Sequence, residues 1–142
     1  MSILDRFSVA GRSALVTGAA SGIGLCYAEA VAEGGASVTL TDVDAEGLER
    51  ETTRLREAGF DVRSAVLDVS DREAVDRVFA EHHAAYGGLE ICFANAGVGI
   101  GPGFWSPGGE REPDGQIDTF DPALWDRSIA INLTGAYNTM RG

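Results

Sequence analysis

A regular alternation between short apolar runs and longer amphipathic segments constrains the fold of this chain most strongly. The apolar runs are typical of buried strands and cover residues 13–17, 37–41, 62–67 and 89–94. The segments between them are typical of helices and cover residues 23–33, 45–58 and 71–86. Each helical segment is long enough to return the chain to the same edge of the sheet, so successive strands run parallel. The pattern therefore predicts an α/β fold with a doubly wound parallel sheet. In the usual topology of such a sheet, the first four strands have the order 3-2-1-4.

The composition indicates one globular domain and excludes several partners. The chain has 142 residues, of which 44% are hydrophobic and 23% are charged, as in an ordinary folded domain. The formal net charge is −11, and every cationic side chain is an arginine because the sequence contains no lysine. A chain this acidic is not expected to bind nucleic acid or an anionic membrane surface. The N-terminus shows no signal peptide, and Cys26 and Cys92 lack metal-binding or redox spacing, so we expect buried free thiols in a cytoplasmic protein.

A glycine-rich turn, Thr17-Gly-Ala-Ala-Ser-Gly-Ile-Gly24, joins the first strand to the first helix. At the carboxyl end of a strand, the helix that follows directs its free N–H groups and the positive end of its dipole outward. A diphosphate can bind to this helix end without a lysine. Gly18 permits the tight turn, Gly22 lets a phosphate approach the backbone, and Gly24 lets the helix pack on the strand. The P-loop, the other common phosphate motif, needs a lysine that this chain lacks. We therefore expect a Rossmann-type dinucleotide site.

Two aspartates end the second and third strands and extend this site. Asp42 stands where a carboxylate accepts hydrogen bonds from both hydroxyls of an adenosine ribose and repels a 2′-phosphate. Neither Ser21 nor Val43 is a cation that would hold that phosphate, so the sequence favours NAD over NADP. Asp68 is expected beside the adenine. The alternatives are a simple strand-end turn residue for Asp42 and a solvated carboxylate before a helix for Asp68.

The third helical segment carries two local signals. Ser70 and Glu73 have the spacing of a capping box, which predicts that Ser70 begins the helix. His82 and His83 are adjacent, and adjacent helix positions point apart. We therefore expect a solvated or interfacial histidine pair rather than a metal site.

A long segment rich in glycine and proline, residues 98–120, follows the fourth strand. Such a loop is either a mobile surface insertion or a flap over a ligand, with Phe104 and Trp105 as apolar cover. Asp121 and Pro122 then predict the start of a last helix, with Trp125 as a packing anchor. This helix runs through Asn132 to the end of the chain.

These motifs resemble those of the short-chain dehydrogenase/reductase family. The family's patterns are TGxxxGxG, an Asp-Val pair beside adenine, Asn-Asn-Ala-Gly, and Trp-Asp-Arg followed by Asn-Leu-Thr-Gly. The matching segments are residues 17–24, 68–69, 95–97, 125–127 and 132–135. Ala94 replaces the first Asn of the third pattern. The match is specific because the motifs occur in order, and it covers about the first half of a family member.

The resemblance implies an oxidoreductase that moves a hydride between a nicotinamide cofactor and an alcohol or carbonyl substrate. It implies no metal. The expected cofactor-binding residues are Gly18, Ser21, Gly22, Ile23, Gly24, Asp42, Val43, Asp68, Val69, Asn95, Ala96 and Gly97. In the family a Tyr acts as acid and base, a Lys four residues later lowers its pKa, a Ser orients the substrate and an Asn anchors a proton-relay water. Asn132 matches that Asn and is the one catalytic residue expected here.

The family's Ser, Tyr and Lys have no counterpart in these 142 residues. Tyr27, Tyr86 and Tyr137 are not followed by a lysine, and a tyrosine with a pKa near 10 needs a neighbouring cation to transfer protons near neutrality. Two hypotheses stay open: an apparently truncated, NAD-binding part of a dehydrogenase, or a non-catalytic NAD-binding or assembly module. In either case we expect little or no turnover from these residues alone. The resemblance also implies association as a homo-oligomer.

Overall fold

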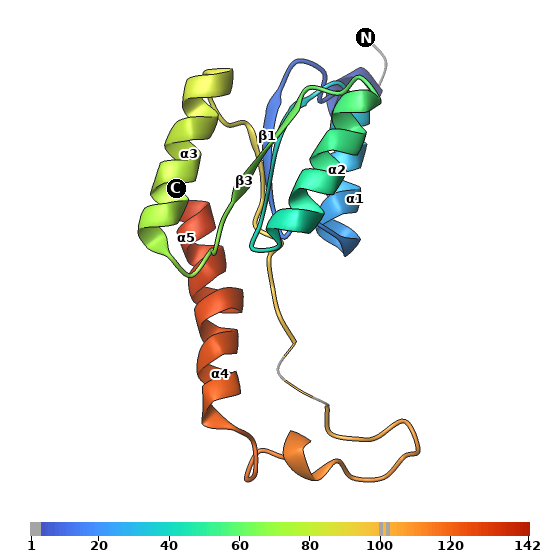
Figure 1. Ribbon diagram of the computed structural model, residues 1–142, viewed down its shortest axis with the longest axis vertical. Helices are drawn as coiled ribbons and strands as arrows, with labels where there is room; N and C mark the ends of the chain where they lie inside the picture. The colour runs from blue at the N-terminus through green and yellow to red at the C-terminus, as the bar shows by residue number, and fades with distance from the viewer. Residues whose placement is uncertain (1–3, 100, 102) are drawn as a thin grey trace.

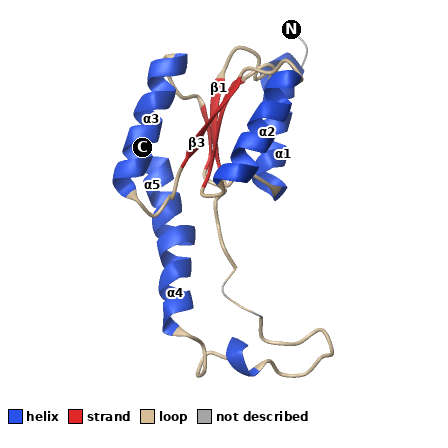
Figure 2. Cartoon of the chain, viewed as in Figure 1, coloured by secondary structure: helices blue, strands red, loops and turns tan. Residues whose placement is uncertain are grey.

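The computed structural model describes residues 4–99, 101 and 103–142 and contains one parallel four-stranded sheet (Figures 1 and 2). The strands are β1 (Ser13–Thr17), β2 (Ser37–Asp42), β3 (Val62–Val66) and β4 (Ile91–Phe93). Their order is β3-β2-β1-β4, and each pairing is parallel. The α/β fold, the doubly wound sheet and the strand order predicted from the sequence are therefore confirmed. The fourth strand is shorter than predicted, because its pairing with β1 spans only Ile91 to Phe93.

Helices cover both faces of the sheet (Figure 2). The helices joined to the strands are α1 (Gly22–Glu33), α2 (Ala45–Glu57), α3 (Arg72–Tyr86), α4 (Pro122–Ser128) and α5 (Ala136–Arg141). Shorter helical segments are η1 (Leu4–Phe7), η2 (Pro113–Gly115) and the π-helical η3 (Ile129–Gly135). α1 and α2 lie on one face, and α3 and α5 lie on the other (Figure 1). No helix among the described residues is long and apolar enough to span a bilayer.

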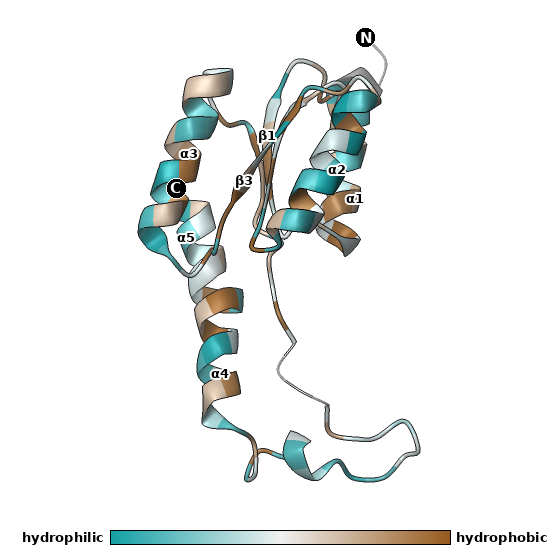
Figure 3. Ribbon diagram, viewed as in Figure 1, coloured by the Kyte–Doolittle hydropathy of each residue, from teal (hydrophilic) through white to brown (hydrophobic). Residues whose placement is uncertain are grey.

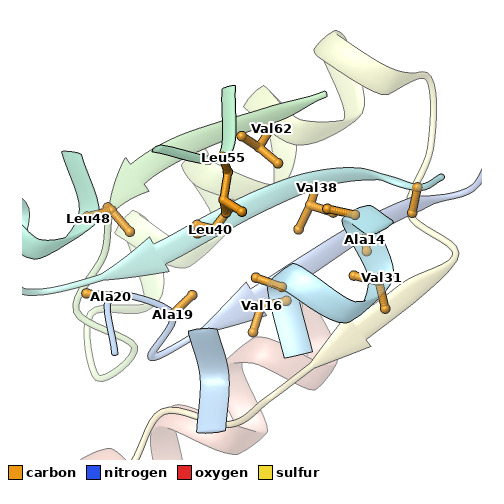
Figure 4. Packing of buried hydrophobic residues seen from close by; sticks show 13 residues of the cluster. Ala14, Val16, Ala19, Ala20, Val31, Val38, Leu40, Leu48, Leu55 and Val62 are labelled. Carbon is orange, nitrogen blue, oxygen red and sulfur yellow. The ribbon is translucent and has the colours of Figure 1, made fainter. Parts of the chain in front are cut away.

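The core has two halves because the strands are buried on both faces. Every residue of β1 is buried. Val16 belongs to the cluster that includes Leu40 and Leu48 (Figure 4), whereas Leu15 belongs to a cluster with Val75 on the other face. Adjacent strand residues point to opposite faces, so continuous apolar runs are what a sheet covered on both sides requires. The strands are accordingly brown over part of their length, and much of α2 is teal in Figure 3.

Aspartates cap three of the helices. Asp44 accepts a hydrogen bond from the Gly47 N–H at the start of α2, and Asp121 accepts one from Ala123 at the start of α4. The capping box predicted for α3 is wrong. Asp71, not Ser70, is the N-cap and accepts from the Ala74 N–H, because the Ser70 hydroxyl donates to Asp68 instead.

α4, η3 and α5 follow one another without a break and form one continuous helix, the long helix, which extends well beyond the sheet (Figure 1). Its start at Asp121 and Pro122 is as predicted. Near its end Gly135 touches Val69, since a Cβ at Gly135 would lie 2.4 Å from Val69 Cγ2. The Asn138 side-chain amide also donates to the Val69 carbonyl at 3.0 Å. The predicted anchor Trp125 is 50% exposed, so these contacts hold the helix and the prediction for Trp125 is wrong.

The segment 98–120 leads away from the sheet and returns to α4 (Figure 1). Residues 100 and 102 of this segment lie outside the described residues. Trp105 and Arg111 form an antiparallel bridge, and η2 follows it. Phe104 and Trp105 are mostly exposed, and neither side chain lines the cavity at the sheet edge. These two side chains therefore do not cover the cavity in this conformation, and the role of the segment as a flap stays a prediction.

The two cysteines are free, as predicted, but they are exposed rather than buried. Cys92 lies on β4, which pairs with β1 alone among the described strands, so its outer side has no neighbouring strand. Cys26 lies on a part of α1 that faces solvent. The prediction of burial was based on composition, which carries no information on which side of an element a residue lies.

His82 is buried between α3 and β2, so the prediction of a solvated or interfacial pair is wrong for this residue. Its exposed fraction is 1%, and its Nδ1 lies 2.8 Å from the Thr39 hydroxyl. Nε2 is also buried, and it has no hydrogen-bond partner in the described structure. Desolvation is the main cause that lowers the pKa of His82 below its ordinary value. His83, one residue later, is exposed as expected.

This burial predicts a loss of stability in mild acid. The unfolded chain takes up a proton on His82 near the ordinary pKa of about 6.5, while the folded chain does so only at lower pH, so stability is complete above about pH 6.5 and falls below it. Between about pH 7 and pH 5.5 the wild type should lose about 1 kcal/mol more unfolding free energy than His82→Leu. Urea unfolding at both pH values measures this. His83→Gln is the control and should lose as much as the wild type; an equal loss in His82→Leu would contradict the prediction.

Candidate functional site

A cavity of about 620 Å³ opens at the carboxyl edge of the sheet. Its wall combines residues that follow the four strands with two residues of the long helix. The lining residues are Gly18, Ser21, Ile23, Gly24, Asp42, Val43, Leu67, Asp68, Val69, Asn95, Ala96, Gly97, Val98, Arg127 and Ile131. Every residue predicted to bind the cofactor is among them except Gly22, which lies between Ser21 and Ile23. The structure therefore brings together in one place residues that the sequence distributes over four segments.

Glycines set the shape of the turn between β1 and α1. Gly18 has φ +69° and Gly22 has φ +56°, in the left-handed region that L side chains rarely adopt. A Cβ at Gly24 would lie 2.0 Å from the Gly18 carbonyl oxygen, so the helix packs on the turn only because this residue has no side chain. A Cβ at Gly22 would meet nothing within 4 Å, so its backbone faces open space. The packing role predicted for Gly24 and the turn predicted for Gly18 are confirmed.

The N-terminus of α1 differs from those of α2, α3 and α4. Each of those three begins with an aspartate whose carboxylate accepts a backbone N–H. The N-cap of α1 is Ser21, whose side chain makes no capping hydrogen bond, and the first turn of α1 contains no acidic residue. The first N–H groups of a helix have no partner within it, so in α1 these donors and the positive end of the dipole remain available at the cavity.

Asp42 is held on the cavity wall by two backbone amides. Its Oδ2 accepts from the Ala20 N–H at 3.0 Å, and its Oδ1 accepts from the Asp44 N–H at 3.1 Å. These bonds fix the orientation of the carboxylate between the turn after β1 and the start of α2. Each carboxylate oxygen can accept a further hydrogen bond, so the group can still bind a hydroxyl.

Asp68 also takes part in a local turn. Its Oδ1 accepts from both the backbone N–H and the hydroxyl of Ser70, at 2.9 and 2.7 Å. The side chain is exposed and lines the cavity, while Val69 beside it is buried. Asp68 therefore holds the turn after β3, and its second oxygen makes no hydrogen bond in the described structure.

The loop after β4 is tied to the end of β1 by Thr17. The N–H groups of Asn95 and Ala96 both donate to the Thr17 hydroxyl at 3.0 Å. The Asn95 side-chain amide donates to the Thr17 carbonyl at 3.0 Å. Sequence reasoning gave Thr17 no role of its own. The signal was a hydroxyl residue at the last position of an otherwise apolar strand.

Asn132 joins the long helix to the same loop. Its Oδ1 accepts from the Val98 N–H at 2.8 Å, and its Nδ2 donates to the Val98 carbonyl at 2.9 Å and to the Ser128 hydroxyl at 3.1 Å. Both the oxygen and the nitrogen of this amide thus take part in positioning, and the side chain does not line the cavity. The catalytic role of Asn132 stays a prediction. No group of three or more His, Cys, Asp or Glu side chains among the described residues is arranged to hold a metal.

Comparison with known proteins identifies the family. The short chain dehydrogenase family model matches residues 12–142. The chain belongs to the short-chain dehydrogenase family. It is similar to cis-4-hydroxycyclohexanecarboxylate dehydrogenase from Sinomonas cyclohexanicum, with 39% identity over 126 residues that cover 89% of this chain and 45% of that protein. Gluconate 5-dehydrogenase from Gluconobacter oxydans is 40% identical over 137 residues, which cover 96% of this chain and 48% of that protein.

The fold of this short-chain dehydrogenase chain also matches a solved structure. A short-chain dehydrogenase/reductase from Burkholderia phymatum, crystallised in complex with NAD, superposes with a TM-score of 0.83 at 32% identity. The match covers 95% of this chain and 43% of that one. The chain thus spans less than half the length of these relatives.

The close contact at Gly24 predicts a strong effect of one added methyl group. Gly24→Ala should lower the free energy of unfolding by about 1–3 kcal/mol, because the new Cβ would overlap backbone that cannot move independently of β1. Chemical denaturation measures the change. Gly88→Ala is the control, since a Cβ there meets nothing within 4 Å, and it should be nearly neutral. A neutral Gly24→Ala would mean that α1 does not pack this closely.

Proposed function

We propose that this chain forms the cofactor-binding part of an NAD-dependent oxidoreductase that moves a hydride between nicotinamide and an alcohol or carbonyl. The uncapped N-terminus of α1, open to the cavity beside Gly22, carries the proposal. The three neighbouring helices use aspartate caps, so free amides at this one helix call for an anionic partner. A volume of about 620 Å³ lies within the usual range for cofactor sites.

The cavity offers a separate contact for each part of a dinucleotide. The amides after Ser21 would hold the diphosphate, and Asp42 would accept the hydroxyls of the adenosine ribose. Asp68 and Val69 would flank the adenine, and the loop of Asn95 would lie along the second half of the cofactor. When bound, the cofactor supplies the hydride acceptor or donor; this chain supplies binding and orientation.

The contacts at Asp42 favour NAD over NADP. The carboxylate is fixed by Ala20 and Asp44, so it cannot swing away from an approaching 2′-phosphate. Its neighbours at the cavity, Ser21 and Val43, supply no cation for that phosphate. The Burkholderia phymatum relative was crystallised with NAD, which supports the same choice.

The acid and base of the reaction are not assigned within these residues. The family resemblance implies a Tyr with a Lys four residues later, and the 142 residues contain no lysine. This absence is what would favour a non-catalytic NAD-binding module. The dehydrogenase proposal is preferred because the names of two relatives that match most of this chain are those of dehydrogenases for hydroxylated compounds. An alcohol or carbonyl substrate, a cytoplasmic location and a homo-oligomer remain parts of the proposal.

Exchanging Asp42 tests the cofactor assignment. The wild type should bind NADH more tightly than NADPH. Asp42→Ala should weaken NADH binding about tenfold, because two hydroxyl contacts to a charged group are lost, and should strengthen NADPH binding by removing a repulsion. Isothermal titration calorimetry measures both dissociation constants.

The opposite changes in NADH and NADPH affinity separate this effect from partial unfolding, which would weaken the binding of both ligands. Glu57→Ala removes an exposed carboxylate far from the cavity and should leave both constants unchanged. If the folded wild type bound neither nucleotide, the proposed function would be wrong.

Ser21 provides a test with opposite effects on stability and binding. Ser21→Asp should cap α1 and raise the free energy of unfolding by about 1 kcal/mol. The same carboxylate should occupy the free amides, repel a diphosphate and weaken NADH binding at least about tenfold. Denaturation and calorimetry on one sample measure both. Ser8→Asp places the same change in an exposed loop and should alter neither; unchanged NADH affinity in Ser21→Asp would exclude α1 as the diphosphate site.

A further inference from the structure

One charged group at the cavity was not expected from the sequence. Asp42, Asp68 and Arg127 are the charged side chains among its lining residues, so Arg127 is the one cation that faces it. Arg127 lies on α4, in the part of the long helix that extends beyond the sheet, and this helix continues into α5 on the face opposite α1 (Figure 1). A ligand in the cavity would therefore have the free amides of α1 on one side and a guanidinium on the other.

The guanidinium of Arg127 is not committed to the protein. Within the described part of the chain, no hydrogen bond or ion pair involves its side chain. By contrast, Arg50, Arg54, Arg111 and Arg141 pair with carboxylates. Several other arginines donate to backbone or side-chain oxygens instead. Arg12 and Arg77 also make no side-chain hydrogen bond or ion pair among the described residues, but unlike Arg127 they do not line the cavity.

The backbone that carries Arg127 is held in place. Asp121 caps the start of α4, and Asn132 fixes the following turns to Val98 through two hydrogen bonds. Ile131, four residues after Arg127 and on the same side of the helix, packs against the core cluster of Leu67 and Val69. Arg127 thus lines the cavity one helical turn before a residue that packs on the core, on a helix that these contacts hold in place.

An arginine suits an anionic ligand at this position. Its planar guanidinium donates two parallel hydrogen bonds to phosphate oxygens, and it keeps its charge at every accessible pH. The two aspartates of the wall would repel an anion. The amides of the helix would then have to bind it in the negative electrostatic potential of these carboxylates. A cation at the opposite wall offsets that repulsion.

We propose that Arg127 is a cofactor-binding residue that holds the diphosphate of the dinucleotide against the N-terminus of α1. This inference rests on the proposed function, because it takes the same ligand in the same cavity. It adds a cationic side chain from the long helix to the backbone amides of the glycine-rich turn. It also gives α4 a role in cofactor affinity besides connecting the loop 98–120 to the rest of the fold.

The test compares three ligands with and without the charge. Arg127→Gln should raise the dissociation constants of NADH and of ADP-ribose about tenfold and leave that of adenosine unchanged, since adenosine lacks the diphosphate. Arg127→Lys should retain part of the affinity, because lysine keeps the positive charge but cannot form the bidentate hydrogen bonds of a guanidinium. The effect should shrink at high salt, since the site is open to solvent. Calorimetry at two ionic strengths provides these values.

Arg77→Gln is the matched control. Arg77 is exposed on α3, away from the cavity, and its exchange changes the net charge equally. It should leave all three constants as in the wild type, which excludes a general charge effect. Thermal unfolding should be nearly the same for all variants, because the Arg127 side chain is exposed and makes no hydrogen bond or ion pair in the described structure.

Each result decides between the two proposals. If the wild type binds NADH and Arg127→Gln binds it equally well, Arg127 does not hold the cofactor and the proposed function stands. If Arg127→Gln weakens the binding of adenosine as much as that of NADH, the guanidinium contacts the adenosine half and the diphosphate assignment is wrong. If the wild type does not bind NADH, the proposed function fails and this inference fails with it.

Discussion

The contact between Gly24 and the Gly18 carbonyl is the constraint on which the site depends. It brings α1 against the end of β1 so closely that no side chain fits between them. The uncapped start of α1 lies at the cavity, since Ser21, Ile23 and Gly24 line it. The other walls are then placed relative to this one, since Ala20 within the same turn donates to Asp42 at the end of β2.

Two hydrogen-bond networks complete the cavity from the other side. Thr17 ties the loop after β4 to the end of β1, and Asn132 ties the long helix to that same loop. Gly135 and Asn138 hold the far end of the helix on Val69. The helix that brings Arg127 to the cavity is therefore fixed at three places. A residue that the family resemblance implies to be catalytic serves here to position others.

The sequence predicted the secondary structure and the glycine-rich turn better than it predicted the surroundings of individual side chains. The strands, the helices and the glycine-rich turn were found because each depends on residues close together in the chain. The errors concern partners and burial. Ser70 has the spacing of a cap, but Asp68 binds its hydroxyl and Asp71 caps instead. His82 and His83 look equivalent in sequence, yet only His82 faces β2.

The sequence by itself determined the strands, the place of the turn and the aspartate at the end of β2, because hydrophobic periodicity and glycine spacing act over a few residues. The strand order was inferred from the usual topology of a doubly wound sheet. Only the tertiary structure decided that the amides of α1 stay uncapped and that Asp42 is clamped by two amides. It also decided that Arg127, rather than Arg77, faces the cavity. The reason is physical: these properties arise from contacts between segments far apart in the chain. Whether a polar group is left free depends on what the fold brings within hydrogen-bonding distance.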